Sequence, residues 1–567
     1  MRRTMLLPAA LIAATAAACA GSADYGTGDG TTDVGGDGAS ASDAGVGNQC
    51  LSSSECPTGY VCTDFGQCQL PSVPAGDGGV VTPPETEYEY GAPVSSNRYV
   101  YVAMTAQDEL ARIDGATLGV KSTGVGEAPR VASAIPGSDG AVVLDATNGT
   151  ATVVRPTGDT DRTRVLPTLR HLNRLDIDPS GRFAVVWFDL TKAIADGGLS
   201  GIGSFQDVTV IALADGVERA VNLAVGFRPR AVEFDATGSR AYVITEDGVS
   251  VVDLGYATTH PPALVPPIPV AAPGVPPADL EVHIVATGQY AVVRQAGFAG
   301  LRVVDVDGVA IGQSWEIPLA SAPTDLDFAP DGRRVYAVER EAKQLAVVDI
   351  PGDAFDPSGV ERVDLAGTAI GSLTVSADGR RGLLYTNATL DERITLLRLD
   401  APGIPHVTWP LKKAVRAIGL SPTGTSAIII HAKAPGNPAT ATSVDDYIDK
   451  SYGYSMLDLA TGFAKLEVTP VDPGPFVYAP DGTKAYIALD GGDVPTAPRA
   501  LEIVETATGV VNVVALGSPP SAVGILPGAG TAFVSQRHPL GRVSFVDLAT
   551  NAIRTVTGFD LNGGIVN

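Results

Sequence analysis

Short runs of alternating apolar and polar residues recur along most of the chain, and they are clearest between residues 322 and 365. Two such runs flank a Pro-Asp-Gly turn at 330–332, which predicts two short antiparallel strands. A near-continuous apolar run at 345–350 predicts a third strand that is covered on both faces. A weaker run at 360–365 predicts a fourth strand, so this stretch forms one four-stranded unit.

A recurring turn glycine allows the units to be counted. A tight turn between paired strands needs a positive φ, which glycine adopts without steric strain. It recurs at intervals of 41 to 58 residues, at Gly140, Gly181, Gly238, Gly288, Gly332, Gly379, Gly424, Gly482 and Gly530. Periods of this length with four strands are typical of propeller blades, whereas helical repeats would place apolar residues at i, i+3 and i+4. The sequence therefore predicts an all-β propeller of four-stranded blades.

Ten units begin near residues 98, 128, 171, 228, 276, 322, 369, 414, 473 and 519. The first unit lacks a first strand, and Phe559–Asn567 remains after the last unit, so we expect a C-terminal strand to close the ring. Ten units exceed the usual four to eight blades. Three arrangements remain open: one large ring, two smaller rings, or a smaller ring with one or two decorating units. Between seven and ten blades are therefore plausible.

The N-terminus predicts export. Arg2 and Arg3 precede an apolar run that ends at Ala18, so residues 1–18 are expected to be a signal peptide. Ala16 to Cys19 resembles the lipobox of bacterial lipoproteins, which implies lipidation of Cys19, although that family usually has Leu where this chain has Ala16. Ordinary cleavage at a small-x-small site is the alternative. No later apolar run is long enough to span a bilayer.

Three segments separate this leader from the repeats. Residues 19–49 begin with the anchor cysteine and continue as a Gly-, Ser- and Asp-rich flexible tether. Residues 50–68 carry four evenly spaced cysteines, Cys50, Cys56, Cys62 and Cys68. In an exported chain they predict two disulfides of undetermined pairing, and the alternative, a zinc knuckle, usually has paired C-x2-C spacing. Residues 69–97 form a linker, and residues 98–567 form the propeller.

Composition and charge narrow the possible partners. The chain is 45% hydrophobic but only 6% aromatic, and 65 Gly with 42 Pro supply many turns. Its formal net charge is −24. Binding to a phosphate backbone needs clustered Lys and Arg, so the sequence predicts no nucleic-acid partner.

The repeats resemble the YVTN β-propeller family, relatives of WD40 and lactonase-type propellers. The turn Ala329-Pro330-Asp331-Gly332 followed by Tyr336 carries the match, and it recurs as Ala479-Pro480-Asp481-Gly482 followed by Tyr486. Val-Val-Asp strands at 251–253, 303–305 and 347–349 add to it. The resemblance covers roughly residues 98–567 and implies the fold, but propellers host unrelated functions.

One face of the propeller is the candidate recognition surface. Strands alternate in direction within a blade, so loops after second and fourth strands emerge opposite the glycine turns. Two insertions, at 189–206 and 433–452, follow second strands and therefore project from that face. Long loops on a rigid scaffold commonly carry binding residues, although loops also lengthen without any ligand.

First strands line the central channel of a propeller, and four of them begin with an arginine. These candidate ligand-binding residues are Arg130, Arg174, Arg230 and Arg416. Together they could attract a carboxylate, a phosphate or a sulfated sugar. The structural alternative is that arginine is common at this place in the resembling family and pairs with acidic residues such as Asp176, Asp325 and Asp327.

No catalytic motif stands out, and the six histidines do not cluster in one unit. We therefore expect no catalytic residue, no metal and no cofactor. The leading hypothesis is a non-enzymatic, lipid-anchored propeller of the bacterial cell envelope, on the periplasmic or surface side of the outer membrane, that binds a protein, peptide or glycan. The rivals are an exported lactonase-like or other hydrolytic propeller, whose acid–base residues would be scattered among blades, and a purely structural envelope component.

Overall fold

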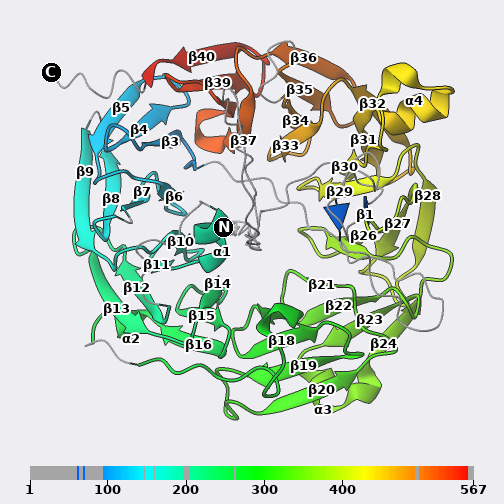
Figure 1. Ribbon diagram of the computed structural model, residues 1–567, viewed down its shortest axis with the longest axis horizontal. Coiled ribbons are helices and arrows are strands. Elements are labelled where there is room, and N and C mark those ends of the chain that lie inside the picture. The colour runs from blue at the N-terminus through cyan, green and yellow to red at the C-terminus, as the bar shows by residue number, and fades with distance from the viewer. Residues whose placement is uncertain are drawn as a thin grey trace, which may run out of the picture.

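The computed structural model describes residues 61–62, 68–69, 94–145, 147–158, 160–195, 205–260, 264–491 and 497–559. Ten antiparallel sheets of this part of the chain stand around one axis (Figure 1). The colour runs once around the ring, so that the last sheet, in red, lies beside the first, in blue. The predicted all-β propeller and its ten units are confirmed, and they form one ring, not two.

Each sheet is a meander whose strands pair in sequence order. Eight sheets have four described strands: β6 (Val131–Ala134), β7 (Ala141–Asp145), β8 (Thr150–Thr157) and β9 (Thr160–Pro167); β10 (Arg174–Ile177), β11 (Phe183–Trp187), β12 (Asp207–Ala212) and β13 (Arg219–Ala224); β17 (Leu280–Ile284), β18 (Tyr290–Gln295), β19 (Gly300–Asp305) and β20 (Ser314–Pro318); β21 (Asp325–Phe328), β22 (Arg334–Glu339), β23 (Gln344–Asp349) and β24 (Glu361–Asp364); β25 (Ser372–Val375), β26 (Arg381–Tyr385), β27 (Arg393–Arg398) and β28 (His406–Pro410); β29 (Val415–Leu420), β30 (Ser426–His431), β31 (Tyr452–Asp458) and β32 (Ala464–Thr469); β33 (Pro473–Tyr478), β34 (Lys484–Leu489), β35 (Ala500–Glu505) and β36 (Val511–Ala515); β37 (Pro520–Leu526), β38 (Thr531–Gln536), β39 (Arg542–Asp547) and β40 (Ile553–Thr557). Two sheets have three: β3 (Tyr99–Met104), β4 (Glu109–Asp114) and β5 (Val120–Gly124); β14 (Pro229–Phe234), β15 (Arg240–Thr245) and β16 (Gly248–Asp253).

The helices of the described chain are short and lie in the connections: α1 (Leu190–Ala195), α2 (Leu254–Ala257), α3 (Gly352–Phe355), α4 (Val444–Lys450) and single 3₁₀ turns at Pro277–Asp279, Pro357–Gly359, Pro438–Thr440 and Pro527–Ala529. Within the described residues, none of the helices has the length and apolar character needed to cross a membrane. In the cysteine segment, β1 (Val61–Cys62) pairs with β2 (Cys68–Gln69), which sets Cys62 opposite Cys68 along the backbone. The predicted disulfides and the lipidation of Cys19 lie outside what the structure describes.

Each sheet is buried on both faces by its two neighbours. In β22, Val335 and Ala337 pack toward the preceding sheet, among residues that include Val292. The alternate residues Tyr336 and Val338 pack toward the following sheet. A strand sends successive side chains to opposite faces, so a strand between two sheets must be apolar at every position. This explains the near-continuous apolar runs of the repeats.

The turn glycines behave as predicted in eight of the nine units, where each has a φ between 62° and 78°. The exception is Gly140, whose φ is not positive; in that turn Gly137 takes the left-handed conformation, with a φ of 71°. The prediction for Gly140 is therefore wrong, because the Pro-Gly-Ser-Asp-Gly turn of this unit is longer and bends earlier.

The first and last sheets meet in a shared apolar cluster that contains Val100, Phe533 and Phe559. The amide of Gly528 also donates a hydrogen bond of 2.8 Å to the carbonyl of Asn97. The first-strand place of the first sheet is occupied in part by Val94–Ser96, which bridges to β3, so the sheet begins within the predicted linker. Residues 560–567 lie outside the described chain, and closure by a C-terminal strand stays a prediction.

The sheet of β14 to β16 lacks a regular fourth strand. The connection that follows holds eight prolines between residues 261 and 277, and proline has no N–H with which to build a ladder. Only Ile268 pairs with Val249, through two backbone hydrogen bonds of 2.8 and 3.0 Å. The rest of this proline-rich connection, 264–279, crosses toward the axis and enters β17.

Two turn glycines have the same backbone conformation but differ in how closely the neighbouring sheet approaches them. Gly332 and Gly530 have φ values of 64° and 65°, but a Cβ on Gly332 would lie 2.4 Å from the backbone nitrogen of Ala286, whereas one on Gly530 meets nothing within 4 Å. We expect Gly530→Ala to destabilise the protein by about 1–2 kcal/mol through backbone strain alone. Gly332→Ala should cost about 1–3 kcal/mol more, because the neighbouring sheet must shift. Urea unfolding followed by circular dichroism tests this, and equal losses would contradict it.

Candidate functional site

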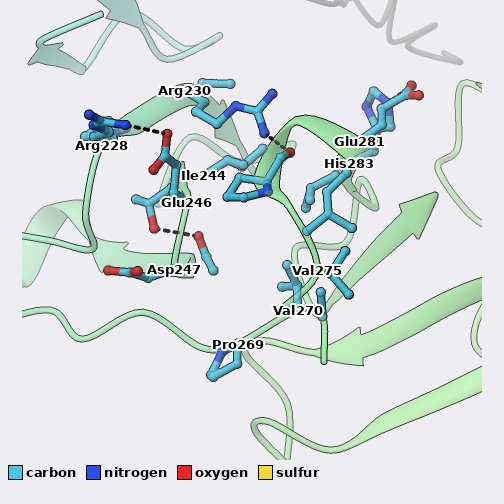
Figure 2. Close-up of a pocket in the computed structure, with 18 of the residues that line it drawn as sticks. Arg228, Arg230, Ile244, Glu246, Asp247, Pro269, Val270, Val275, Glu281 and His283 are labelled. Carbon is cyan, nitrogen blue, oxygen red and sulfur yellow. Dashed lines mark hydrogen bonds and ion pairs between the residues drawn. The ribbon is translucent and has the colours of Figure 1, made fainter. Parts of the chain in front are cut away.

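A cavity of about 600 Å³ opens at the axis-facing ends of three neighbouring sheets (Figure 2). It lies on the face from which the second strands emerge into loops, so it lies on the predicted recognition face. Its walls come from the starts of β10, β14 and β17, the turn between β15 and β16, and the proline-rich connection. The first residues after β11, Asp189, Leu190 and Thr191, complete the rim.

One wall of the cavity is apolar. Ile244 and Val270 are buried, and Val275, which lies next to Val270, is half-buried (Figure 2). Prolines restrict the backbone of this wall, and the pairing of Ile268 with β16 anchors it. The apolar surface is therefore preformed.

Most charges around the cavity are neutralised by each other. Nε of Arg174 lies 2.8 Å from Oδ2 of Asp189, so the start of β10 is tied to the loop after β11. Nη1 of Arg228 lies 3.4 Å from Oε1 of Glu246, as Figure 2 shows. These two pairs form the rim and leave little charge for a ligand.

Arg230 is different. It is the second residue of β14, and its side chain is exposed. One guanidinium nitrogen donates to the carbonyl of Pro277 in the proline-rich connection (Figure 2). No carboxylate lies within ion-pair distance of Arg230 among the residues that the structure describes. The carbonyl fixes the direction of the guanidinium without neutralising its charge.

A charged network joins three sheets beside the cavity. Nε2 of His283 lies 2.7 Å from Glu281, and its Nδ1 lies 3.6 Å from Glu233. Arg294 donates one hydrogen bond to Glu281 and another, of 3.1 Å, to the carbonyl of Thr324. Burial opposes the charge on His283, but the two carboxylates outweigh it and raise its pKa to about 10. Burial likewise opposes the charge on Glu281, yet His283 and Arg294 lower its pKa to about 2.

This network is structural in character. An imidazolium with a pKa near 10 holds its proton at neutral pH and cannot serve there as a general base. Among the described residues no group of three or more His, Cys, Asp or Glu side chains is arranged to hold a metal ion.

The other two candidate arginines lie outside the cavity. Arg416 forms a two-point ion pair with Asp472, with N–O distances of 2.7 and 2.9 Å, and so connects two sheets. Arg130 is exposed, and within the described chain it has neither a hydrogen bond nor an ion pair. The structure thus brings together Arg174 and Arg230 only, and the four arginines do not form one ring.

The acidic residues that were the alternative partners of these arginines bind other groups. Asp325 and Asp327 accept backbone N–H groups of Leu373 and Val375 in the next sheet, each at 2.7 Å. Burial raises their pKa values to about 7 and about 6. Asp176 accepts the indole N–H of Trp187 at 2.6 Å. These carboxylates stabilise the inner edges of the sheets.

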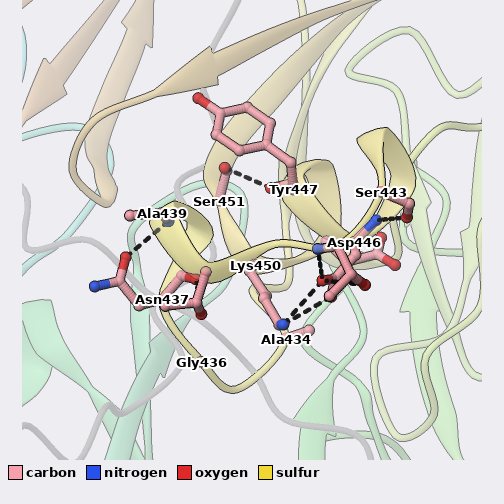
Figure 3. A network of polar contacts seen from close by, with 12 residues as sticks. Ala434, Gly436, Asn437, Ala439, Ser443, Asp446, Tyr447, Lys450 and Ser451 are labelled. Atoms are coloured by element: carbon pink, nitrogen blue, oxygen red, sulfur yellow. Dashed lines mark hydrogen bonds and ion pairs between the residues drawn. The ribbon is translucent and has the colours of Figure 1, made fainter.

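The two predicted insertions differ in position. The first contributes α1 and the cavity rim, although residues 196–204 are outside the described chain. The second carries α4 at the outer edge of the ring, far from the axis (Figure 1). Within this helix Ser443 is the N-cap and Lys450 pairs with Asp446 (Figure 3). Buried Lys413 connects the helix to the ring, because it donates to the carbonyls of Ile448 and Asp449. This insertion is a rigid element separate from the cavity.

Sequence reasoning missed the proline-rich connection, which forms much of the cavity wall. It lies after a third strand and does not lengthen the glycine spacing conspicuously. The density of prolines between residues 261 and 277 was the available signal, because it is incompatible with a regular fourth strand.

The pH dependence of stability tests the network at His283. Its folded pKa of about 10 exceeds its ordinary value of 6.5, so its stabilising contribution is complete below pH 6.5 and is lost as the pH rises through 10. We expect His283→Gln to lower the free energy of unfolding by about 1–3 kcal/mol at pH 6 and by far less above pH 10. His406→Gln, an exposed position on β28, is the control. A difference that does not change with pH would contradict the assignment.

Comparison with known proteins yields no family. No protein-family model matches the chain, and no curated protein matches it in sequence. Among solved structures, hydrazine synthase of Kuenenia stuttgartiensis is similar at 16% identity over 47% of this chain and 76% of that chain, with a TM-score of 0.30. The dihydro-heme d1 dehydrogenase NirN matches at 13% over 62% and 71%, with a TM-score of 0.36. AztD from Citrobacter koseri matches at 12% over 67% and 95%, with a TM-score of 0.37. At these values the likenesses carry no argument about chemistry.

Proposed function

We propose that this protein is an exported, lipid-anchored, non-enzymatic binding propeller of the bacterial cell envelope, and that it binds an anionic group of a protein, peptide or glycan in the cavity beside Arg230. One observation carries the proposal: Arg230 points its guanidinium at a preformed cavity, and no described carboxylate neutralises it. A guanidinium binds carboxylate, phosphate and sulfate groups through two parallel hydrogen bonds.

The size and lining of the cavity support a small ligand or the end of a larger one. Ligand pockets commonly enclose about 300–1,000 Å³, with mostly apolar walls and a few polar groups that set orientation. The cavity has about 600 Å³, an apolar wall around Val270 and one unneutralised arginine. Because the carbonyl of Pro277 already orients the guanidinium, less side-chain entropy is lost when a ligand binds.

The hydrolytic alternative has less support. An acid–base reaction needs groups whose pKa lies near neutrality, beside the bound substrate. Asp325 and Asp327 have such pKa values, but they do not line the cavity, and each accepts a backbone hydrogen bond from the next sheet. Their raised pKa values reflect burial between strands.

The N-terminal sequence supports the envelope location. The charged and apolar leader, the cysteine at position 19 and a long polar tether are typical of an exported lipoprotein. In such an arrangement the propeller stays near the membrane surface while it searches for a ligand.

Binding of anions to matched arginine variants tests the site. We expect at least one of inorganic phosphate, a sulfated oligosaccharide and a short peptide with a free carboxyl end to bind the full chain in calorimetry. Arg230→Gln should weaken that binding about 10- to 100-fold, because a charge-assisted hydrogen-bond pair is lost. Arg130→Gln is the matched control, since Arg130 holds the same place in another unit and lies outside the cavity. Equal effects of the two variants, or no binding by any anion, would contradict the proposal.

The anchor is tested separately in a bacterial host that processes lipoproteins. We expect the wild-type chain to incorporate labelled palmitate and to sediment with membranes, and Cys19→Ala to lose the label and enter the soluble exported fraction, because the thiol is the acyl acceptor. Ser22→Ala is the control for an unspecific change near the leader. Unchanged labelling of Cys19→Ala would show that Cys19 is not lipidated.

A further inference from the structure

The charges around the cavity leave two groups without a partner of opposite charge. Arg174 is neutralised by Asp189, Arg228 by Glu246, and His283 by its two glutamates. The remaining cation is Arg230. The remaining anion that lines the cavity is Asp247, for which the described residues offer no ion pair.

Asp247 is held rigidly at the rim. It lies in the two-residue turn Glu246-Asp247 between β15 and β16, where Thr245 pairs with Gly248. One carboxylate oxygen accepts the N–H of Phe227 at 2.9 Å, and the amide of Glu246 donates to the carbonyl of Phe227 at 2.9 Å. The turn is thereby bound to the connection that leads into β14, and the second carboxylate oxygen remains available.

The two unpaired charges come from different elements and do not meet. Arg230 is the second residue of β14, whereas Asp247 follows β15, and no ion pair joins them. Both side chains line the same cavity, together with the apolar residues Val270 and Val275. In Figure 2 the carboxylate of Asp247 lies at the left, on the side away from Val270 and Val275. A ligand in this cavity therefore meets a positive group, a negative group and an apolar wall.

From this arrangement we infer that the ligand is a zwitterion with an apolar body, such as a short apolar peptide with both ends free. Its carboxylate binds Arg230, its ammonium group binds Asp247, and its side chains pack on Ile244, Val270 and Val275. This inference rests on the proposed function and adds the second charge. A purely anionic ligand, such as a sulfated glycan, would meet Asp247 with a charge of the same sign.

Three forms of one peptide separate the two charges. Calorimetry on the full chain would compare trileucine with both ends free, N-acetyl-trileucine and trileucine amide. We expect the free peptide to bind, acetylation to weaken binding about tenfold or more, and amidation to weaken it at least as much, since each modification removes one charge-assisted contact.

Variants then assign each charge to its residue. Asp247→Asn keeps an acceptor for the Phe227 N–H, so the turn should survive. We expect this variant to bind the free and the acetylated peptide equally, while Arg230→Gln loses the distinction between the free peptide and the amide. Asp364→Asn is the matched control, because Asp364 is also exposed and also accepts a backbone N–H, but lies on the outer strand β24.

The outcomes distinguish this inference from the proposed function. Three results would contradict the inference of a zwitterionic ligand. They are equally tight binding of the acetylated and the free peptide to wild type, no binding of any form at about 1 mM, and the same behaviour of Asp247→Asn and Asp364→Asn. The proposed function still holds in those cases, provided that other anions bind and lose affinity in Arg230→Gln. If Arg230→Gln leaves anion binding unchanged, the proposed function fails and the inference fails with it.

Discussion

The face-to-face packing of ten sheets around one axis is the constraint on which the rest of the structure depends. No blade can bury its two apolar faces alone, so each sheet needs a neighbour on either side. The alternation in β22, with Val335 facing one neighbour and Tyr336 the other, shows the consequence at the level of single residues. The ring must close for the same reason, and the shared cluster of the first and last sheets with Phe559 provides that contact.

The same arrangement leaves unpaired strand edges at the axis. The innermost strand of each sheet has one side without a partner strand, and its N–H groups need acceptors. Asp325 and Asp327 supply them across the gap to the next sheet, and Glu233 does so for the amide of Ile284. Acidic residues on these strands are therefore part of the architecture, and burial there raises the pKa values of Asp325 and Asp327.

The candidate site arises where the repeat is least regular. Prolines prevent a fourth strand beside β16, and the chain that would have formed it turns inward and builds a wall next to Arg230. β15 pairs with β16 in unbroken register, whereas the pairing of β14 with β15 shifts between Pro229 and Ala231, at the position of Arg230. A propeller tolerates such a local departure because its loops project away from the packed faces of the sheets.

The sequence alone determined the number of units, the order of strands in each unit and the face on which the loops lie. These properties depend on local chemistry, namely two-residue alternation and a turn that requires glycine, although in one unit Gly137 replaces Gly140. Only the tertiary structure decided which of the four arginines meet a carboxylate. Arg416 meets Asp472 from 56 residues away, while Arg230 meets a carbonyl 47 residues away. Such partners come from other units, and the spacing of a repeat does not specify which side chains its neighbours present.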